Sequence, residues 1–166
     1  MSIFPTRILL ATDGSKEADL AALMAVDMAE NTDSELHVVH VGVVPSFLMS
    51  YPGTLGYDRK LYEQIEEESR ELLRKLSWRV KVAGGAVAGA HLRMGMVHLE
   101  IAALAEELGV GLIVMGCRGH RGIRRAIEGS ISSAVIRHAP CPVLVVRSHV
   151  RAESPERPAL LQGGGR

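Results

Sequence analysis

The stretch Gly111–Arg147 constrains the fold of this chain more than any other part of the sequence. It contains two short apolar runs, Leu112–Met115 and Val143–Val146, separated by a loop rich in glycine and arginine. Between the loop and the second run, Gly129 and Ser130 open a helical pattern. Short buried runs that alternate with a helix are typical of parallel α/β sheets. The stretch therefore predicts a strand, a loop, a helix and a second strand.

The loop itself has the composition of an anion site. Gly116 and Gly119 let the backbone turn sharply and approach a ligand without interference from a Cβ atom. Gly129 and Ser130 stand at a helix N-terminus, where unpaired N–H groups and the helix dipole favour negative charge. The hydroxyl of Ser130 adds a further donor, and that of Ser132 lies one turn into the same helix. We expect these groups to hold phosphate.

The spacing of the loop excludes two standard phosphate motifs and matches a third pattern. A P-loop needs a lysine after its second conserved glycine, and Gly111–Arg147 contains no lysine. The dinucleotide fingerprint G-x-G-x-x-G does not fit glycines that are three residues apart. The spacing present is G-x-x-G-x9-G-S, followed by the strand PCPVLVVR. Together with the N-terminal ILLATDGS, it resembles the ATP-binding signature of the universal stress protein family, over roughly Thr6 to Arg147.

Apolar runs and helical stripes alternate along the rest of the chain. Further strands are expected at Arg7–Thr12, Leu36–Val44 and Val87–Met94, and helices from Ser15 to about Asn31, over Asp58–Ala83, Met96–Leu108 and Gly129–His138. Five strands alternating with four helices predict an α/β fold, a doubly wound parallel sheet with helices on both faces. The resemblance implies the strand order 3-2-1-4-5. Residues 1–147 then form one nucleotide-binding domain, and residues 148–166 a mobile polar tail.

This order places the site where the strand order reverses. In open α/β sheets a ligand binds at that point, outside the carboxyl ends of the strands. The turn Asp13-Gly14-Ser15 and the loop after Leu112–Met115 then flank one crevice. By resemblance, Asp13 meets the ribose or metal side of the nucleotide, and Val39–Val41 meet the base through their backbone. Arg118 either contacts phosphate or faces water. The expected nucleotide-contact residues are Ala11, Thr12, Asp13, Val39, Val41, Met115, Gly116, Arg118, Gly119, Gly129, Ser130, Ile131 and Ser132.

Composition narrows the partners and the location. The 166 residues include 19 basic and 19 acidic side chains, which gives no argument for nucleic acid or a charged membrane as partner. No apolar run reaches the roughly 18 residues of a membrane span. The N-terminus has no signal-peptide pattern, so a cytoplasmic location is expected, with Cys117 and Cys141 as free thiols. Cys117 is either a reactive thiol beside the basic loop or, more simply, a small filler.

Histidines and carboxylates offer little catalytic machinery. His37 and His40 are three residues apart, so on one strand they face opposite sides and cannot share a metal ion. We expect both to be partly exposed strand-end residues. His98 has no second ligand at a recognisable spacing. Asp13 is the carboxylate that can be placed near the phosphates, with Glu128 as a further possibility.

Three functions compete on this basis. The first is a dimeric regulatory or stress-response module that binds ATP, ADP or AMP, with or without Mg²⁺. The second is a slow ATP-hydrolysing enzyme that uses the same site, and the third is a dimerisation module that needs no nucleotide. The resemblance implies pairing through the edge strand Val143–Val146, and a bare apolar edge favours association in every case.

Overall fold

Nine elements alternate along the chain. The computed structural model describes residues 6–45, 59–117 and 130–147, and the predictions for Arg118, Gly119, Gly129 and the tail concern residues outside these ranges. The elements are β1 (Arg7–Ala11), α1 (Lys16–Thr32), β2 (Glu35–Gly42), α2 (Arg59–Val82), β3 (Val87–Met94), α3 (Val97–Leu108), β4 (Leu112–Gly116), α4 (Ser130–His138) and β5 (Val143–Val146).

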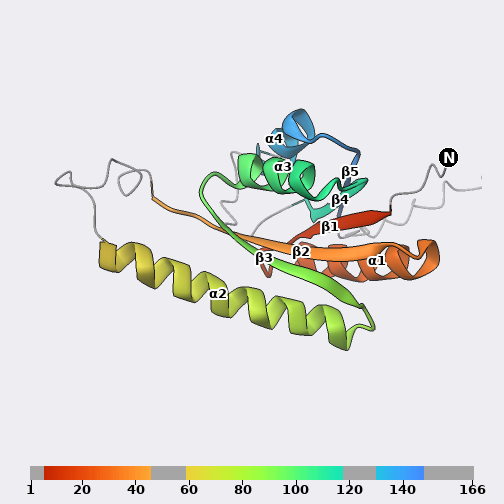
Figure 1. Ribbon diagram of the computed structural model, residues 1–166, viewed down its shortest axis with the longest axis horizontal. Helices are drawn as coiled ribbons and strands as arrows, with labels where there is room; N and C mark the ends of the chain where they lie inside the picture. The colour runs from red at the N-terminus through yellow and green to blue at the C-terminus, as the bar shows by residue number, and fades with distance from the viewer. Residues whose placement is uncertain (1–5, 46–58, 118–129, 148–166) are drawn as a thin grey trace, which may run out of the picture.

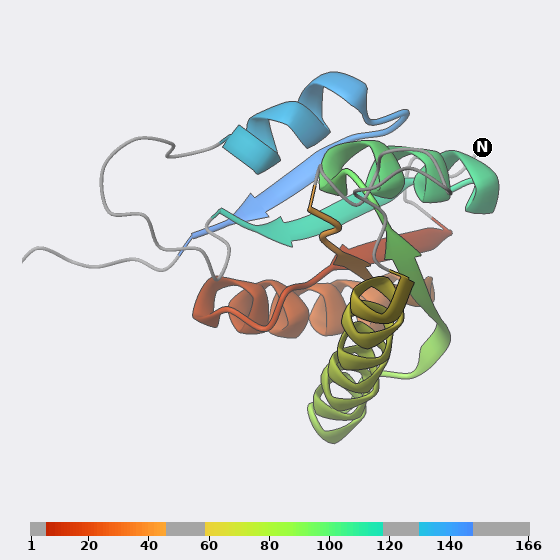
Figure 2. The same cartoon turned by 90° about the vertical axis from the view of Figure 1, so that its left-hand side faces the viewer.

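The strands form one parallel sheet in the order β3-β2-β1-β4-β5. Helices α1 and α2 cover one face of this sheet, and α3 and α4 cover the other (Figures 1 and 2). The doubly wound architecture and the strand order expected from the sequence are therefore confirmed. The chain leaves β1 towards β2 and β3 on one side and later returns to β4 on the other, so the order reverses between β1 and β4.

Two apolar layers explain why the central strands read as continuous apolar runs. Leu10, Val38 and Val114 belong to the layer beneath α1 and α2. Their chain neighbours Leu9 and Ile113 belong to the layer beneath α3 and α4. Each central strand therefore buries both of its faces, as strands of parallel sheets usually do.

Helix α1 buries small residues rather than large ones. Its sheet-facing stripe includes Ala18, Ala21 and Ala25, whereas Leu23 and Met24 are 55% and 43% exposed. Alanines bring the helix backbone close to the strands beneath it. The helix begins at Ser15, whose Oγ accepts a hydrogen bond from the Ala18 amide at 3.2 Å, a standard N-cap.

Helix α2 buries one stripe of its surface against the sheet. Leu73, Leu76 and Val80 are buried, whereas Leu72 is only half-buried. Other positions of the helix form the i,i+4 ion pairs Glu66–Arg70 and Glu71–Lys75, at 2.6 and 3.6 Å. No helix within the described ranges combines the length and apolar character that crossing a bilayer would require.

Strands β1 and β2 end earlier than expected. Strand β1 ends at Ala11 rather than Thr12, and β2 ends at Gly42 rather than Val44. The last bond of β2 on its β3 side joins the Gly95 amide to the Gly42 carbonyl at 3.0 Å. A strand lasts only as far as it has a partner for its backbone, so pairing with β3, rather than the length of the apolar run, sets the end of β2.

Candidate functional site

The turn after β1 is held by its own side chains. Asp13 Oδ1 accepts a hydrogen bond from the Ser15 amide at 3.0 Å. Thr12 is buried, and its Oγ1 lies 3.4 Å from the Gly14 amide nitrogen. Gly14 has a φ of 80°, a left-handed conformation that glycine adopts without strain. The sequence Thr12-Asp13-Gly14-Ser15 therefore specifies both the turn and the start of α1.

His40 supports this turn from the neighbouring strand. Its Nδ1 lies 2.9 Å from the carbonyl oxygen of Thr12. Because a carbonyl can only accept, the Nδ1 carries the proton. The expectation of a partly exposed strand-end histidine is wrong for His40, which is 8% exposed. The available signal was a polar residue at the same β2 parity as the buried Leu36 and Val38, since a buried polar group needs a partner.

The backbone of Val41 borders the space past the end of β1. The Thr12 amide donates to the Val39 carbonyl, so Val39 directs its backbone groups towards β1. The Gly42 carbonyl accepts from Gly95 and therefore faces β3. Backbone groups alternate in direction along a strand, so the N–H and C=O of Val41 also face the β1 side. Ala11, the last residue of β1, is level with Val39, so Val41 lies beyond the end of β1.

Three apolar residues of the expected set lie level with one another across the sheet. The register pairs Ala11 with Val39 on one side and with Met115 on the other. These residues and Val41 belong to the apolar layer beneath α3 and α4. The structure thus brings the expected apolar residues together at the carboxyl ends of β1, β2 and β4.

Gly116, the last residue of β4, packs against the backbone at the start of α1. A Cβ atom on Gly116 would lie 2.7 Å from the backbone carbon of Glu17 and 2.8 Å from the amide nitrogen of Ala18. The absent side chain is thus required by the close approach of α1, whereas the sequence suggested room for a ligand. The two loops expected to flank the site, which begin after β1 and after β4, therefore leave the sheet next to each other.

The remaining residues of the expected set belong to α4. Ser130 is its first residue, Ser132 is buried, and Ile131 is 44% exposed. The side chain of Ser130 and the residues Arg118, Gly119 and Gly129 lie outside what the structure describes. The half of the G-x-x-G-x9-G-S pattern within the described ranges is therefore Gly116 and the N-terminus of α4.

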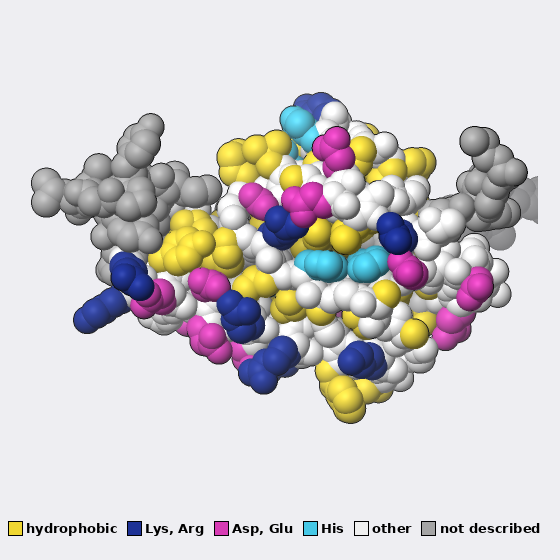
Figure 3. Space-filling view, in the orientation of Figure 1, with side chains coloured by type: hydrophobic (Ala, Val, Ile, Leu, Met, Phe, Trp, Pro, Cys, Tyr) yellow, Lys and Arg dark blue, Asp and Glu magenta, His cyan; other side chains and the backbone are white. Residues whose placement is uncertain are grey.

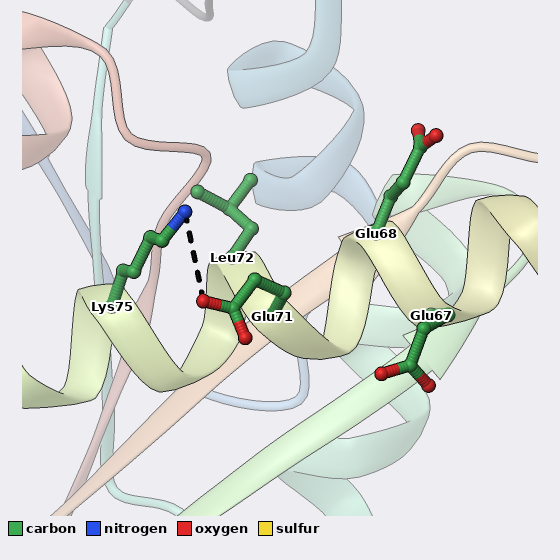
Figure 4. Close-up of a pocket in the computed structure, with 5 residues that line it drawn as sticks. All are labelled: Glu67, Glu68, Glu71, Leu72 and Lys75. Atoms are coloured by element: carbon green, nitrogen blue, oxygen red, sulfur yellow. Dashed lines mark ion pairs between the residues drawn. The ribbon is translucent and has the colours of Figure 1, made fainter.

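A shallow depression elsewhere on the surface does not have the character of a binding site. It is lined by Glu67, Glu68, Glu71, Leu72 and Lys75, all from α2. Figure 4 shows these side chains spread along one helix, with Lys75 paired to Glu71. A small-molecule site usually gathers apolar walls and polar groups from several elements, so this depression is a groove between solvated side chains.

Clusters of metal-ligating side chains and reactive thiols were the other candidate sites. Within the described ranges, no group of three or more His, Cys, Asp or Glu side chains is arranged to hold a metal ion. Cys117 and Cys141 are free thiols, as expected. Burial raises the pKa of the Cys141 thiol, against the smaller opposing effect of a backbone hydrogen bond with Ile113. The protonated form of this thiol is thereby favoured.

Comparisons with known proteins identify the family. The model of the universal stress protein family matches residues 5–147. A relative from Staphylococcus haemolyticus, itself named for the universal stress proteins, is 39% identical over 142 residues, which cover 85% of this chain and 84% of the relative. The solved structure of the universal stress protein UspA from Lactobacillus plantarum has a TM-score of 0.68 and 27% identity, and the match covers 86% of this chain and 97% of that one.

Two further solved structures share the fold and contain an adenine nucleotide. A universal stress protein in complex with cAMP has a TM-score of 0.65 and 20% identity, over 88% of this chain and 99% of that one. The Archaeoglobus fulgidus universal stress protein in complex with dAMP has a TM-score of 0.58 and 22% identity, over 87% and 99%. At these identities the likeness concerns the fold alone. The family match spans most of the sequence and agrees with the strand order observed, and the chain belongs to the universal stress protein family.

Proposed function

We propose that this protein binds an adenine nucleotide at the carboxyl ends of β1, β2 and β4 and acts as a regulatory or stress-response module. The observation that carries the proposal is that three features lie together at the carboxyl ends of the central strands. These are the backbone of Val41 past the end of β1, the turn Asp13-Gly14-Ser15, and the exit of the chain from β4 at Gly116. Open α/β sheets bind their ligands at such a reversal of strand order.

The residues present fit such a ligand chemically. An adenine base needs apolar surface and a donor and acceptor in its plane, which Ala11, Val39 and the backbone of Val41 would offer. The N-terminus of α4 and the glycines after β4 would hold the phosphates through their amides. Asp13 would face the ribose or a Mg²⁺ ion that accompanies the nucleotide. The complexes with cAMP and dAMP support the proposal only at the level of the fold, which accommodates adenine nucleotides.

Binding without rapid turnover is the form of the proposal that we favour. Hydrolysis needs a positioned base or a group that holds water. Asp13 already accepts the Ser15 amide through Oδ1, which gives this carboxylate a structural task in the turn. ATP is the expected ligand, with ADP or AMP as alternatives. The cytoplasmic location stays a prediction.

Loss of binding in a loop variant tests the proposal. Gly119→Val should lower ATP and AMP affinity at least 10-fold, about 1.4 kcal/mol, because a branched side chain would block the approach of the backbone to phosphate. Mass spectrometry of nucleotide extracted from the purified protein, followed by calorimetry, measures this. Ala86→Val provides the matched control, since Ala86 is exposed and precedes β3, at the opposite end of the strands.

The outcomes separate the three competing functions. Unchanged affinity in Gly119→Val, or no affinity in the native protein at about 1 mM nucleotide, would rule out the proposed site. Phosphate release at a rate of about 1 s⁻¹ or more, lost in Asp13→Ala, would establish the enzyme in place of the binding module.

We also propose that the protein forms a homodimer through β5. This strand lies at the edge of the sheet, next to β4 only, and all four of its residues are apolar and half-buried. An edge of this kind is a template for pairing with another strand.

A further inference from the structure

Two histidines from neighbouring strands meet on the sheet. His37 lies on β2 and His91 on β3, and Nδ1 of His37 is 3.2 Å from Nε2 of His91. The register pairs His37 with Gly89 and Val39 with His91, so the two imidazoles are diagonal neighbours on one face. Figure 3 shows two histidine side chains next to each other in the middle of the face that β3 borders, with acidic and basic side chains on both sides.

Gly89 lets both rings pack closely against the backbone of β3. A Cβ atom on Gly89 would lie 2.8 Å from Nδ1 of His37 and 2.8 Å from Nε2 of His91. Gly89 is not among the glycines with a positive φ, so its backbone conformation does not itself require glycine. Glycine is therefore required at position 89 by the close approach of both ring nitrogens to the backbone of β3.

The other nitrogen of His37 faces a carboxylate. Its Nε2 is 3.6 Å from Oε2 of Glu35, and Arg7 Nε donates to the same Glu35 oxygen at 2.7 Å. Nε2 is buried and has no hydrogen-bond partner within the described ranges. The carboxylate favours a proton on Nε2, which leaves the lone pair of Nδ1 directed towards His91. A histidine that binds a metal typically turns its second N–H to a carboxylate in the same way.

We propose that His37 Nδ1 and His91 Nε2 form a binding site for a divalent transition-metal ion of the kind that imidazole prefers, such as Zn²⁺, Cu²⁺ or Ni²⁺. Two nitrogens that each lie about 2.0–2.1 Å from one tetrahedral ion are about 3.3 Å apart. The two nitrogens here are 3.2 Å apart. Water would complete the coordination, so the site exchanges its ion readily.

Ion pairs flank the two histidines on both sides. Arg7 pairs with Glu35 on the His37 side, and Arg93 pairs with Glu107 on the His91 side. Each nearby arginine is thus matched by a carboxylate, so no unpaired arginine among these neighbours opposes a cation at the histidines.

Calorimetric titration of the full, nucleotide-free protein with Zn²⁺ tests the proposal. His37→Asn and His91→Asn should each weaken the tightest Zn²⁺ site at least 10-fold, about 1.4 kcal/mol. His98→Asn is the comparison variant. It leaves the pair intact and removes a histidine of α3 whose ring lies 5.1 Å from that of His138, so loss of the tightest site in this variant alone would assign Zn²⁺ to those histidines and overturn the proposal. The native protein should also melt at a higher temperature with Zn²⁺, since the ion binds only the folded state, and His91→Asn should lose this increase.

Two further variants keep both histidines. Gly89→Ala places a methyl group against both ring nitrogens and forces the rings to shift, and Glu35→Gln removes the carboxylate behind His37. The first should weaken Zn²⁺ binding, and the second should weaken it about 10-fold to 100-fold, as loss of a group that orients a ligand usually does. Equal Zn²⁺ affinity in the His37→Asn, His91→Asn and His98→Asn variants, or no binding up to about 1 mM Zn²⁺, would overturn the proposal and leave a simple hydrogen bond between the two rings.

Discussion

At the scale of single residues, His40 links two parts of the site. It comes from β2, yet its Nδ1 donates to the Thr12 carbonyl in the turn after β1. The bond reaches from a buried strand into the turn that follows β1. One buried side chain therefore positions the turn beside the proposed nucleotide site.

Replacement of His40 should expose this role. His40→Leu keeps the bulk of the side chain but removes the donor, so the buried Thr12 carbonyl loses its partner at a cost of about 1–3 kcal/mol in the free energy of unfolding. Urea denaturation measures the change. His40→Gln, whose amide can donate to the same carbonyl, should recover part of the loss. A His40→Leu protein as stable as the native one would contradict this role.

At the scale of elements, helix α1 shows what the sequence can and cannot reveal. The existence of the helix, its N-cap at Ser15 and its end within two residues follow from sequence patterns. The buried face does not, because large apolar side chains usually mark it and here Leu23 is exposed while Ala21 is fully buried. Only the close approach of α1 to β4 makes alanine the residue that fits.

Two substitutions on α1 should therefore have effects opposite to those expected from hydrophobicity. Ala21→Leu forces extra methylene groups into a filled layer and should cost about 1–3 kcal/mol. Leu23→Ala removes an exposed side chain and should change stability by less than about 0.5 kcal/mol. Denaturant unfolding with an unchanged m-value is the measurement. If Leu23→Ala proved the more harmful change, the orientation of α1 given above would be wrong.

The strands were predicted more completely than the contacts between them. Val87–Met94 and Val143–Val146 have the bounds that the sequence indicated, because glycines and prolines flank them. The pairing of His37 with His91 and of His40 with Thr12 was not predicted. Such contacts depend on which residues lie level on neighbouring strands, and the register of β2 with β3 shifts at Leu36/His37, which the residue pattern along either strand does not reveal.

At the scale of the whole molecule, the strand order came from the resemblance to a family, whereas the number and type of elements came from the residues themselves. The order matters because it brings Asp13, Val41 and Gly116 together at the carboxyl ends of neighbouring strands, although many residues separate them along the chain. The phosphate half of the proposed site includes residues outside the described ranges. The nucleotide affinity of the loop variant Gly119→Val is therefore the test of this half.

The proposed homodimer makes a prediction at this scale. The carbonyl groups of Pro142 and Val146 accept from β4, so by alternation Val145 directs its N–H to the open edge. Val145→Pro removes that N–H and should shift the protein towards the monomer in sedimentation equilibrium. Val145→Ala also shortens the side chain but keeps the N–H, and should remain the more dimeric of the two. Equal association of both variants would exclude pairing through the β5 backbone.

The contact between Gly116 and the first turn of α1 has a practical use. Since there is no room for even a methyl group between the two backbones, any shift of the β4 terminus must be transmitted to α1. Leu20 lies within one turn of that contact and is 39% exposed, so a fluorescent label attached there would not disturb the core. The outer surface of α1 thus offers a place from which to record, by emission, whether the strand termini rearrange when a ligand is added.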